Sequence, residues 1–283
     1  IQVGEGDGMY RMHIHVPTEK RYEPIDYIMG LGTITKVAIE NLLAQMDDIQ
    51  KSKKAARIEF AAVEPGQIAV VVVSPGAGLS RIFASLGVAA VVEGGQTMNP
   101  STQDILQSFE NLPTDKVVIL PNNKNIVMAA NQAKQVTVKR VAVVPTRTVP
   151  QGLAAMLSLT PEGDLDAVAE KMTRAASMVK TGEITVATRT VEIDGVNVES
   201  GQVIALLDGK LVLSANSVEE GVLGFLEKAD AANHELVTLF HGEGMTHAEA
   251  NRIKDTISGK YPALEVEVQE GGQPHYQFII SVE

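Results

Sequence analysis

The chain contains no cysteine and no tryptophan, and only 4% of its residues are aromatic. Disulfide bonds and thiolate chemistry are therefore excluded, and a broad aromatic platform for single-stranded nucleic acid is disfavoured. The longest apolar run, residues 68–73, is far too short to cross a bilayer. We therefore expect a cytoplasmic protein with an aliphatic core and no membrane insertion.

Positive charge is also scarce, because 24 lysine and arginine residues face 35 aspartate and glutamate residues and give a net charge of -11. This charge repels phosphate backbones and anionic lipid headgroups, so we expect no nucleic-acid partner. The 283 residues, 45% of them hydrophobic, are enough for two domains. The chain begins with Ile1 and has no signal pattern, so we expect it to be a fragment of a longer protein.

Residues 1–62 are predicted to be the end of a small α+β domain. Polar and apolar residues alternate over 8–16, as in a half-buried strand, which puts His13 and His15 on one face about 6–7 Å apart. Zinc binds neutral imidazoles at about 2.0–2.1 Å but needs at least one further protein ligand. The residues alone leave two interpretations open, a metal-binding pair and the polar face of a strand. Beyond the pair we expect a helix near 24–29, a strand over 33–40 and a helical stretch that ends near residue 54.

Residues 63–160 have the pattern of a parallel α/β lobe. Apolar runs typical of buried strands alternate with helical segments, which favours a mostly parallel sheet with right-handed crossovers. The expected strands span 68–73, 88–92, 116–120 and 136–144.

Residues 161–283 are predicted to form a mixed α+β lobe. A helix is expected over 165–181, and Asp194-Gly195 and Asp208-Gly209 then mark two hairpins. Further helices are expected at 218–229 and 246–260. Strands are expected at 235–241, 264–268 and 276–282.

Two polar loops follow predicted parallel strands at the sheet edge where open α/β sheets collect ligands. We therefore take Thr97, Asn99, Ser101, Asn122 and Asn123 as candidate ligand-binding or partner-binding residues. The alternative is that these side chains satisfy turn backbone, with Ser101 as the N-cap of a helix over 102–111.

Other patterns predict little chemistry. Gly76-Ala77-Gly78 lacks the lysine of a P-loop and the third glycine of a dinucleotide site, so close packing is the preferred interpretation. His234, His241, His247 and His275 have no metal-ligand spacing, and we expect most of them to be solvated, with His241 and His275 near one sheet end. No G-x-S-x-G elbow accompanies them. Met128 and Met156 are expected in the core.

Several segments together resemble bacterial fatty acid kinase, specifically its dihydroxyacetone-kinase-like component, which is a partner of DegV-family proteins. The resemblance covers nearly the whole chain, from the end of the family's middle domain through its carboxy-terminal domain. It is carried by His13-Ile14-His15-Val16, Gly94-Gly95-Gln96-Thr97-Met98-Asn99-Pro100-Ser101-Thr102, Leu120-Pro121-Asn122-Asn123-Lys124-Asn125, Thr148-Val149-Pro150-Gln151-Gly152 and Gly271-Gly272-Gln273-Pro274.

The resemblance implies a DegV-like two-lobed α/β domain preceded by a small α+β segment. It places ATP and magnesium on an amino-terminal domain that these residues lack, and it makes His13 and His15 zinc ligands together with an upstream cysteine. The implied reaction phosphorylates a fatty acid held by an acyl-loaded, fatty-acid-binding protein of the DegV family, and the acyl phosphate enters phospholipid synthesis. In DegV-type carriers a threonine-serine loop holds the fatty acid carboxylate, so the resemblance makes Thr97, Asn99 and Ser101 candidates for a related pocket or its relic.

Two functions from different classes remain. The favoured one is a non-catalytic interaction module that positions the acyl-loaded partner by proximity and orientation. The alternative is a self-contained DegV-type fatty-acid-binding protein. A kinase complete within this chain is disfavoured, because no phosphate motif or cluster of magnesium carboxylates is present. The sequence leaves open whether the chain forms a homodimer.

Overall fold

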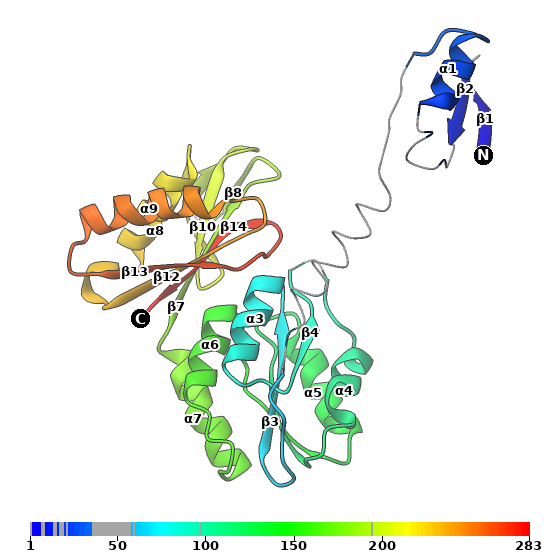
Figure 1. Ribbon diagram of the computed structural model, residues 1–283. Helices are drawn as coiled ribbons and strands as arrows, with labels where there is room; N and C mark the ends of the chain where they lie inside the picture. The colour runs from blue at the N-terminus through cyan, green and yellow to red at the C-terminus, as the bar shows by residue number, and fades with distance from the viewer. Residues whose placement is uncertain are drawn as a thin grey trace. The chain divides into compact units, whose positions relative to one another are not determined.

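The computed structural model in Figure 1 describes residues 2–6, 9–13, 16, 20, 22–35, 58, 60–96, 98–193 and 195–283. The chain divides into two compact units, residues 1–57 and 58–283. No helix among the described residues is long and apolar enough to cross a membrane.

The first unit contains a two-stranded antiparallel sheet and a short helix. Strand β1 (Gln2–Gly6) pairs with β2 (Met9–His13), and α1 (Glu23–Met29) has proline in its first turn, where no amide is needed. The sequence predicted β2 and α1 but missed β1. Residues 33–35 are not a strand in the structure. The rest of that predicted strand and the helical stretch ending near residue 54 lie outside the described residues.

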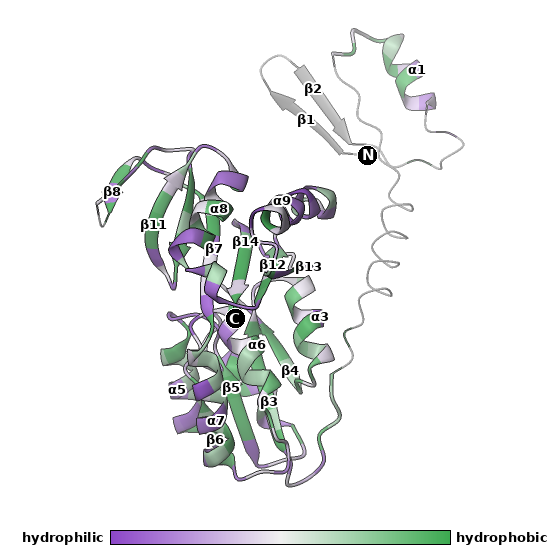
Figure 2. Cartoon of the chain, turned by 90° about the vertical axis from the view of Figure 1, so that its left-hand side faces the viewer, coloured by the Kyte–Doolittle hydropathy of each residue, from purple (hydrophilic) through white to green (hydrophobic). Residues whose placement is uncertain are grey.

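The second unit begins with a four-stranded parallel sheet of order β4-β3-β5-β6. Its strands are β3 (Ile68–Ser74), β4 (Ala90–Glu93), β5 (Lys116–Leu120) and β6 (Arg140–Val143). Every residue of β3 is buried, as expected for a strand covered on both faces. Figure 2 shows β3 as largely hydrophobic.

Helices cover both faces of this sheet. On one face, Val70 and Val72 share a core cluster with residues of α3 (Ala77–Ser85), α6 (Val149–Leu157) and α7 (Leu165–Ser177). On the other face, Val71 and Val73 share one with residues of α4 (Thr102–Glu110) and α5 (Val127–Val136). The alternation of β3 side chains therefore builds two separate cores on one sheet.

The second sheet has six strands in the order β11-β10-β7-β14-β12-β13 and is antiparallel except for the β12–β13 pair. Helices α8 (Val218–Lys228) and α9 (His247–Lys260) pack on one face. A short 3₁₀ helix spans Ala231–Asn233. The strands are β7 (Lys180–Val186), β10 (Val203–Leu207), β11 (Lys210–Ala215), β12 (Leu236–His241), β13 (Glu265–Glu270) and β14 (Tyr276–Val282).

The parallel sheet with helices α3 to α7 is called the first lobe below, and the six-stranded sheet with α8 and α9 is called the second lobe. The other face of the six-stranded sheet packs against the first lobe. Phe240 of β12 and Ile279 of β14 belong to the same core cluster as α3, α6 and α7, so this cluster continues from the first lobe onto one face of the second sheet, whose other face has a separate cluster. This continuous core fixes the edge at which the loops of the two lobes meet.

The fold class predicted from the sequence is confirmed, with one parallel sheet and one mixed sheet. Both predicted hairpins are present, at β8 (Val191–Ile193) with β9 (Val196–Val198) and at β10 with β11. Two boundaries were wrong. Residue Val136 ends α5, so β6 starts only at Arg140, and the predicted helix over 165–181 stops at Ser177 because β7 begins at Lys180.

Candidate functional site

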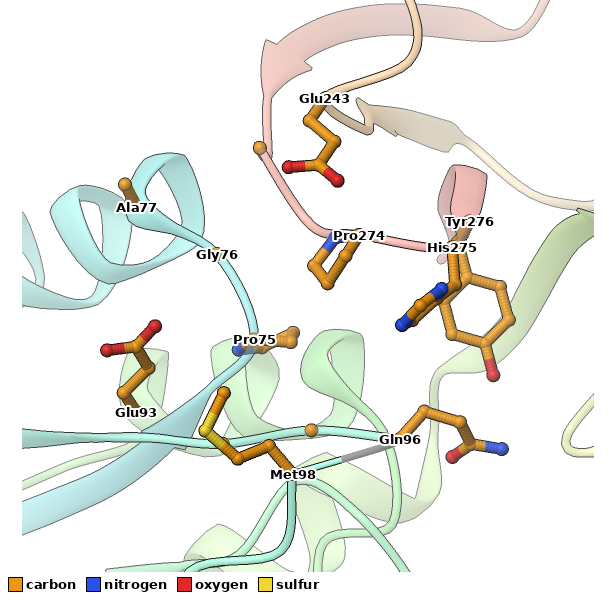
Figure 3. Close-up of a pocket in the computed structure, with 13 residues that line it drawn as sticks. Pro75, Gly76, Ala77, Glu93, Gln96, Met98, Glu243, Pro274, His275 and Tyr276 are labelled. Atoms are coloured by element: carbon orange, nitrogen blue, oxygen red, sulfur yellow. The ribbon is translucent and has the colours of Figure 1, made fainter. Parts of the chain in front are cut away.

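A pocket of about 210 Å³ lies between the two lobes, beyond the carboxyl ends of β3 and β4. The first lobe contributes residues from 75–77 and 93–98, and the second contributes Glu243 and the loop that precedes β14. Glu93 and Glu243 approach the pocket from opposite lobes (Figure 3). No lysine or arginine is among the described residues that line it.

The glycines of Gly76-Ala77-Gly78 allow the two lobes to approach closely at one wall of this pocket. A Cβ on Gly78 would lie 2.0 Å from the carbonyl oxygen of Glu270, and one on Gly76 would lie 2.5 Å from that of Gly271. The Leu79 amide donates to the Gly271 carbonyl at 3.0 Å. The preferred interpretation of this motif, close packing, is therefore confirmed.

The Gly271-Gly272-Gln273-Pro274 segment is held against the end of β12. The amides of Gly271 and Gly272 both donate to the His241 carbonyl, and the buried Gln273 amide group donates to the Phe240 carbonyl at 2.8 Å. Together with the bond from the Leu79 amide of α3, these bonds tie the pocket wall to two elements, β12 and α3, and so hold it at a defined position.

The first lobe positions Gln96 through one of the predicted residues. The Asn123 side-chain amide donates to the Gln96 side-chain oxygen at 3.1 Å, and the Asn123 oxygen accepts the Asn125 amide at 2.9 Å. Gln96 lines the pocket, so the loops that follow β4 and β5 meet there. The sequence singled out Asn123 but not Gln96.

The other predicted loop residues that the structure describes do not line the pocket. Asn122 is buried, has a positive φ of 54° and donates to the Val73 carbonyl at 2.9 Å. Ser101 caps α4 and forms a capping box with Asp104, which lowers the pKa of that carboxyl through the Ser101 hydrogen bonds. Asn99 is exposed, and Thr97 lies outside the described residues.

Beside the pocket, a carboxyl group and a phenol are hydrogen-bonded to each other. Burial raises the pKa of Glu183 above its usual value, while the hydrogen bond from Tyr276 and the charge of Lys124 partly offset that rise. The pKa of the Tyr276 hydroxyl is likewise well above its ordinary range, because of burial and the neighbouring Glu183 charge. Tyr276 therefore remains a neutral donor at the pocket wall.

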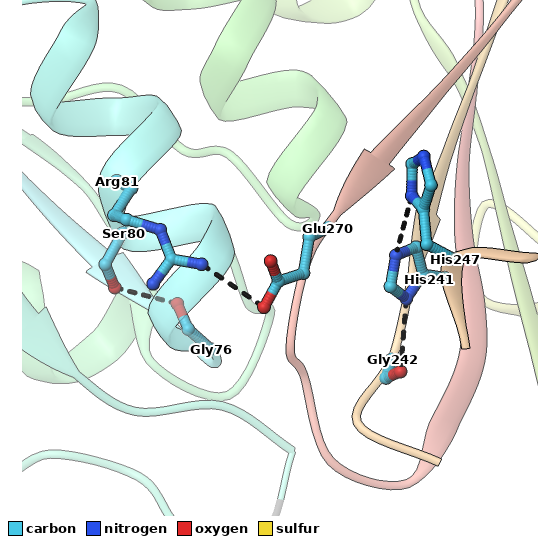
Figure 4. Close-up of polar contacts among 7 residues, drawn as sticks. All are labelled: Gly76, Ser80, Arg81, His241, Gly242, His247 and Glu270. Carbon is cyan, nitrogen blue, oxygen red and sulfur yellow. Dashed lines mark hydrogen bonds and ion pairs between the residues drawn. The ribbon is translucent and has the colours of Figure 1, made fainter. Parts of the chain in front are cut away.

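The histidines do not gather at this pocket as a group. We expected most of the four histidines to be solvated; His247 and His275 are exposed, whereas His241 is the exception and is only 5% exposed. Its Nε2 lies 3.4 Å from Nδ1 of His247 (Figure 4). His275 lines the pocket and is exposed. Arg81 and Glu270 form an ion pair at 3.3 Å across the lobes.

The predicted metal pair falls at the edge of the described structure. His13 ends β2, and His15 lies outside the described residues. Within the part of the chain that the structure describes, no group of three or more histidine, cysteine, aspartate or glutamate side chains could hold a metal ion. Zinc at His13 and His15 therefore stays a prediction.

The two methionines singled out in the sequence differ in environment. Met156 is 4% exposed in the core, as expected, whereas Met128 in the first turn of α5 is 70% exposed, so its prediction was wrong. Met98, which the sequence did not single out, lines the pocket and is 60% exposed.

Comparison with known protein families gives a match over residues 69–283 to the FakA-like C-terminal family of fatty acid kinase components. The chain belongs to this family. Among curated relatives, protein YloV of Bacillus subtilis is 36% identical over 98% of this chain and 50% of its own length, and an uncharacterized Staphylococcus epidermidis protein is 34% identical over the same shares. The chain thus spans about half the length of these relatives.

Solved structures show that this FakA-like domain has the DegV fold. A DegV family protein from Corynebacterium glutamicum superposes with a TM-score of 0.57 at 15% identity and covers 76% of this chain and 96% of its own. DegV of Bacillus subtilis, described as a fatty acid binding protein, superposes with a TM-score of 0.53 at 13% identity, and the match covers 76% of this chain and 98% of that protein. At such low identity the likeness concerns the fold alone.

Within the FakA-like domain, the structure brings together residues that sequence reasoning missed. Glu93 and Gln96 lie on one segment of the chain, Glu243 and Tyr276 lie on two others, and none of the four belongs to a recognisable catalytic motif. The one usable signal was position, because Glu93 ends β4 and Glu243 closely follows β12.

Proposed function

We propose that this chain is the partner-binding, non-ATP-binding portion of a fatty acid kinase. It holds an acyl-loaded protein of the DegV family, whose fatty acid is phosphorylated to an acyl phosphate for phospholipid synthesis. ATP and magnesium are assigned to the half of the relatives that this chain does not span. Membership of the FakA-like family supports this assignment.

The observation that carries the proposal is the acidic lining of the pocket between the lobes. An ionised fatty acid carboxylate placed beside Glu93 and Glu243 would meet like charge, with no lysine or arginine among the described lining residues to offset it. The cavity of about 210 Å³ is also smaller than the roughly 300–1,000 Å³ typical of ligand pockets. Both features favour the interaction module over a carrier of its own fatty acid.

The contribution of such a module is proximity. Fixing the acyl-loaded protein near the ATP-bearing domain turns an encounter of two proteins into a reaction within one complex, and this requires no bond-making residue here. The two sheets and their shared core provide the rigid support that such positioning requires.

A combined binding experiment tests the proposal. The purified chain is incubated with an acyl-loaded DegV-family fatty-acid-binding protein, and native mass spectrometry records both complexes and bound lipid. We expect a complex of the two proteins, with the fatty acid on the partner alone. A chain that carries fatty acid by itself and forms no complex would support the self-contained carrier and refute the module.

Zinc at His13 and His15 is a separate proposal for the first unit. Metal analysis of the purified chain tests it. The double variant His13→Ala/His15→Ala is expected to lose any bound zinc, and the absence of zinc from the unaltered chain would contradict the assignment for this chain.

A further inference from the structure

We propose that the pocket between the lobes is a socket for an arginine or lysine side chain presented by the protein partner. This inference rests on the proposed function and adds the chemistry of the contact. The pocket combines a cavity, two carboxylates from different lobes and an apolar wall, and each of these favours the tip of a long cationic side chain.

The charge of the pocket is unbalanced. Glu93 and Glu243 are both exposed, and neither forms an ion pair with any residue that the structure describes. The other described lining residues include no further carboxylate, and their ionisable side chains are those of His275 and Tyr276. A guanidinium or ammonium group that enters this space therefore finds unpaired carboxylates, and charge-assisted hydrogen bonds to carboxylates are among the strongest in proteins.

The size of the pocket fits a side chain. An apolar cavity of about 150 Å³ is enough to bind benzene, so about 210 Å³ accommodates a guanidinium with part of its aliphatic stem. Pro75, Pro274 and Met98 supply apolar surface for that stem. A long acyl chain does not fit the same volume.

The walls of the socket are held in place before any partner arrives. The Gln96 side chain is bonded to Asn123, and the Glu243 amide donates to the Gln273 carbonyl at 3.1 Å. The loop that carries Gln273 is itself bonded to β12. A preorganised contact loses less conformational entropy on binding, which favours specific recognition of the partner.

The decisive variant is Glu93→Gln/Glu243→Gln, which keeps the shape of both side chains and removes their charge. Its affinity for an acyl-loaded DegV-family protein is measured by biolayer interferometry at 50 and 200 mM salt, beside the unaltered chain. We expect at least tenfold weaker binding at low salt and a smaller loss of affinity on raising the salt, because the screened charge pair is gone. The charge reversal Glu93→Lys/Glu243→Lys is expected to abolish binding.

A matched control changes the same number of charges elsewhere. Glu192 and Glu265 are exposed and lie outside the pocket lining, so Glu192→Gln/Glu265→Gln is expected to bind like the unaltered chain. Thermal unfolding of each variant shows whether it is folded. Agmatine, a small guanidinium compound, is expected to compete with the partner for the unaltered chain and to leave the residual binding of the glutamine variant unchanged.

The outcomes separate this inference from the function on which it rests. If the unaltered chain does not bind the acyl-loaded protein, the proposed function fails. If it binds and the pocket variant binds equally well, only the socket is refuted. Sedimentation velocity of the unaltered chain and of the glutamine variant tests one further outcome. If the unaltered chain self-associates, the variant does not, and both bind the partner equally well, then the occupant of the pocket is a second copy of this chain and the proposal is overturned.

Discussion

At the residue scale, single glycines decide how closely the two lobes approach. Gly78 has no room for a methyl group, because its Cβ would lie 2.0 Å from a backbone oxygen that cannot move without shifting the loop at 270–273. Gly259 in α9 has open space at the same position. The two glycines therefore form a matched pair for one substitution.

Gly78→Ala is expected to lower the free energy of unfolding by about 1–3 kcal/mol, as overpacked sites do. Gly259→Ala is expected to raise it by about 0.4–1 kcal/mol, because alanine restricts the unfolded chain and favours the helix. Urea unfolding followed by circular dichroism measures both. Equal effects of the two substitutions would contradict the close approach of the lobes at Gly78.

At the element scale, strand identity could be predicted better than element ends or the site. The β-branched run at 68–73 favours a strand and the Asp-Gly pairs favour hairpin turns, and the structure has a strand and two hairpins at these positions. Val136 and Val138 also suggest a strand, yet Val136 ends α5 and Val138 is 98% exposed. The sheet edge that forms one wall of the pocket was predicted from the strand order, but the opposite wall was not, because only the tertiary contact between the lobes brings Glu93 near Glu243.

Ser101, at the start of α4, has two candidate roles, as the N-cap of the helix and as a contact residue for the partner. Its hydroxyl accepts the Asp104 amide, and the Asp104 carboxylate accepts the Ser101 amide at 2.8 Å. Ser101→Ala is expected to cost about 1 kcal/mol of stability, the usual value of an N-cap. Affinity for the acyl-loaded partner, measured on the same sample, is expected to stay unchanged. Weaker binding without lost stability would instead identify Ser101 as a contact residue.

At the scale of the whole molecule, the lobes are joined by both apolar and polar contacts. Phe240 and Ile279 extend the first lobe's core into the second sheet, and the Thr148 and Thr181 hydroxyls bond at 2.8 Å where α6 meets β7. Lys124 of the first lobe acts electrostatically on Glu183 of the second. Titration of Glu183 is therefore expected to affect the stability of the joined unit.

The sign of this effect follows from the raised pKa of Glu183. The folded chain keeps a proton that the unfolded chain releases near the ordinary value of 4.5, so the stability contributed by this group is complete below that pH. It is lost as pH rises through the raised folded pKa. Glu183→Gln does not titrate and can still accept the Tyr276 hydroxyl.

Thermal unfolding of both proteins from pH 4 to 8 measures the effect. Relative to the glutamine variant, the unaltered chain is expected to lose stability as pH rises above about 4.5 and to level off once Glu183 is ionised in the folded state. Tyr276→Phe is expected to move that loss to higher pH, because the Tyr276 hydrogen bond lowers the pKa of Glu183. A stability difference that is constant with pH would show that the pKa of Glu183 is the same in the folded and unfolded chain, and one that grows in favour of the unaltered chain as pH rises would show a lowered folded pKa; either result would contradict control of its proton by burial.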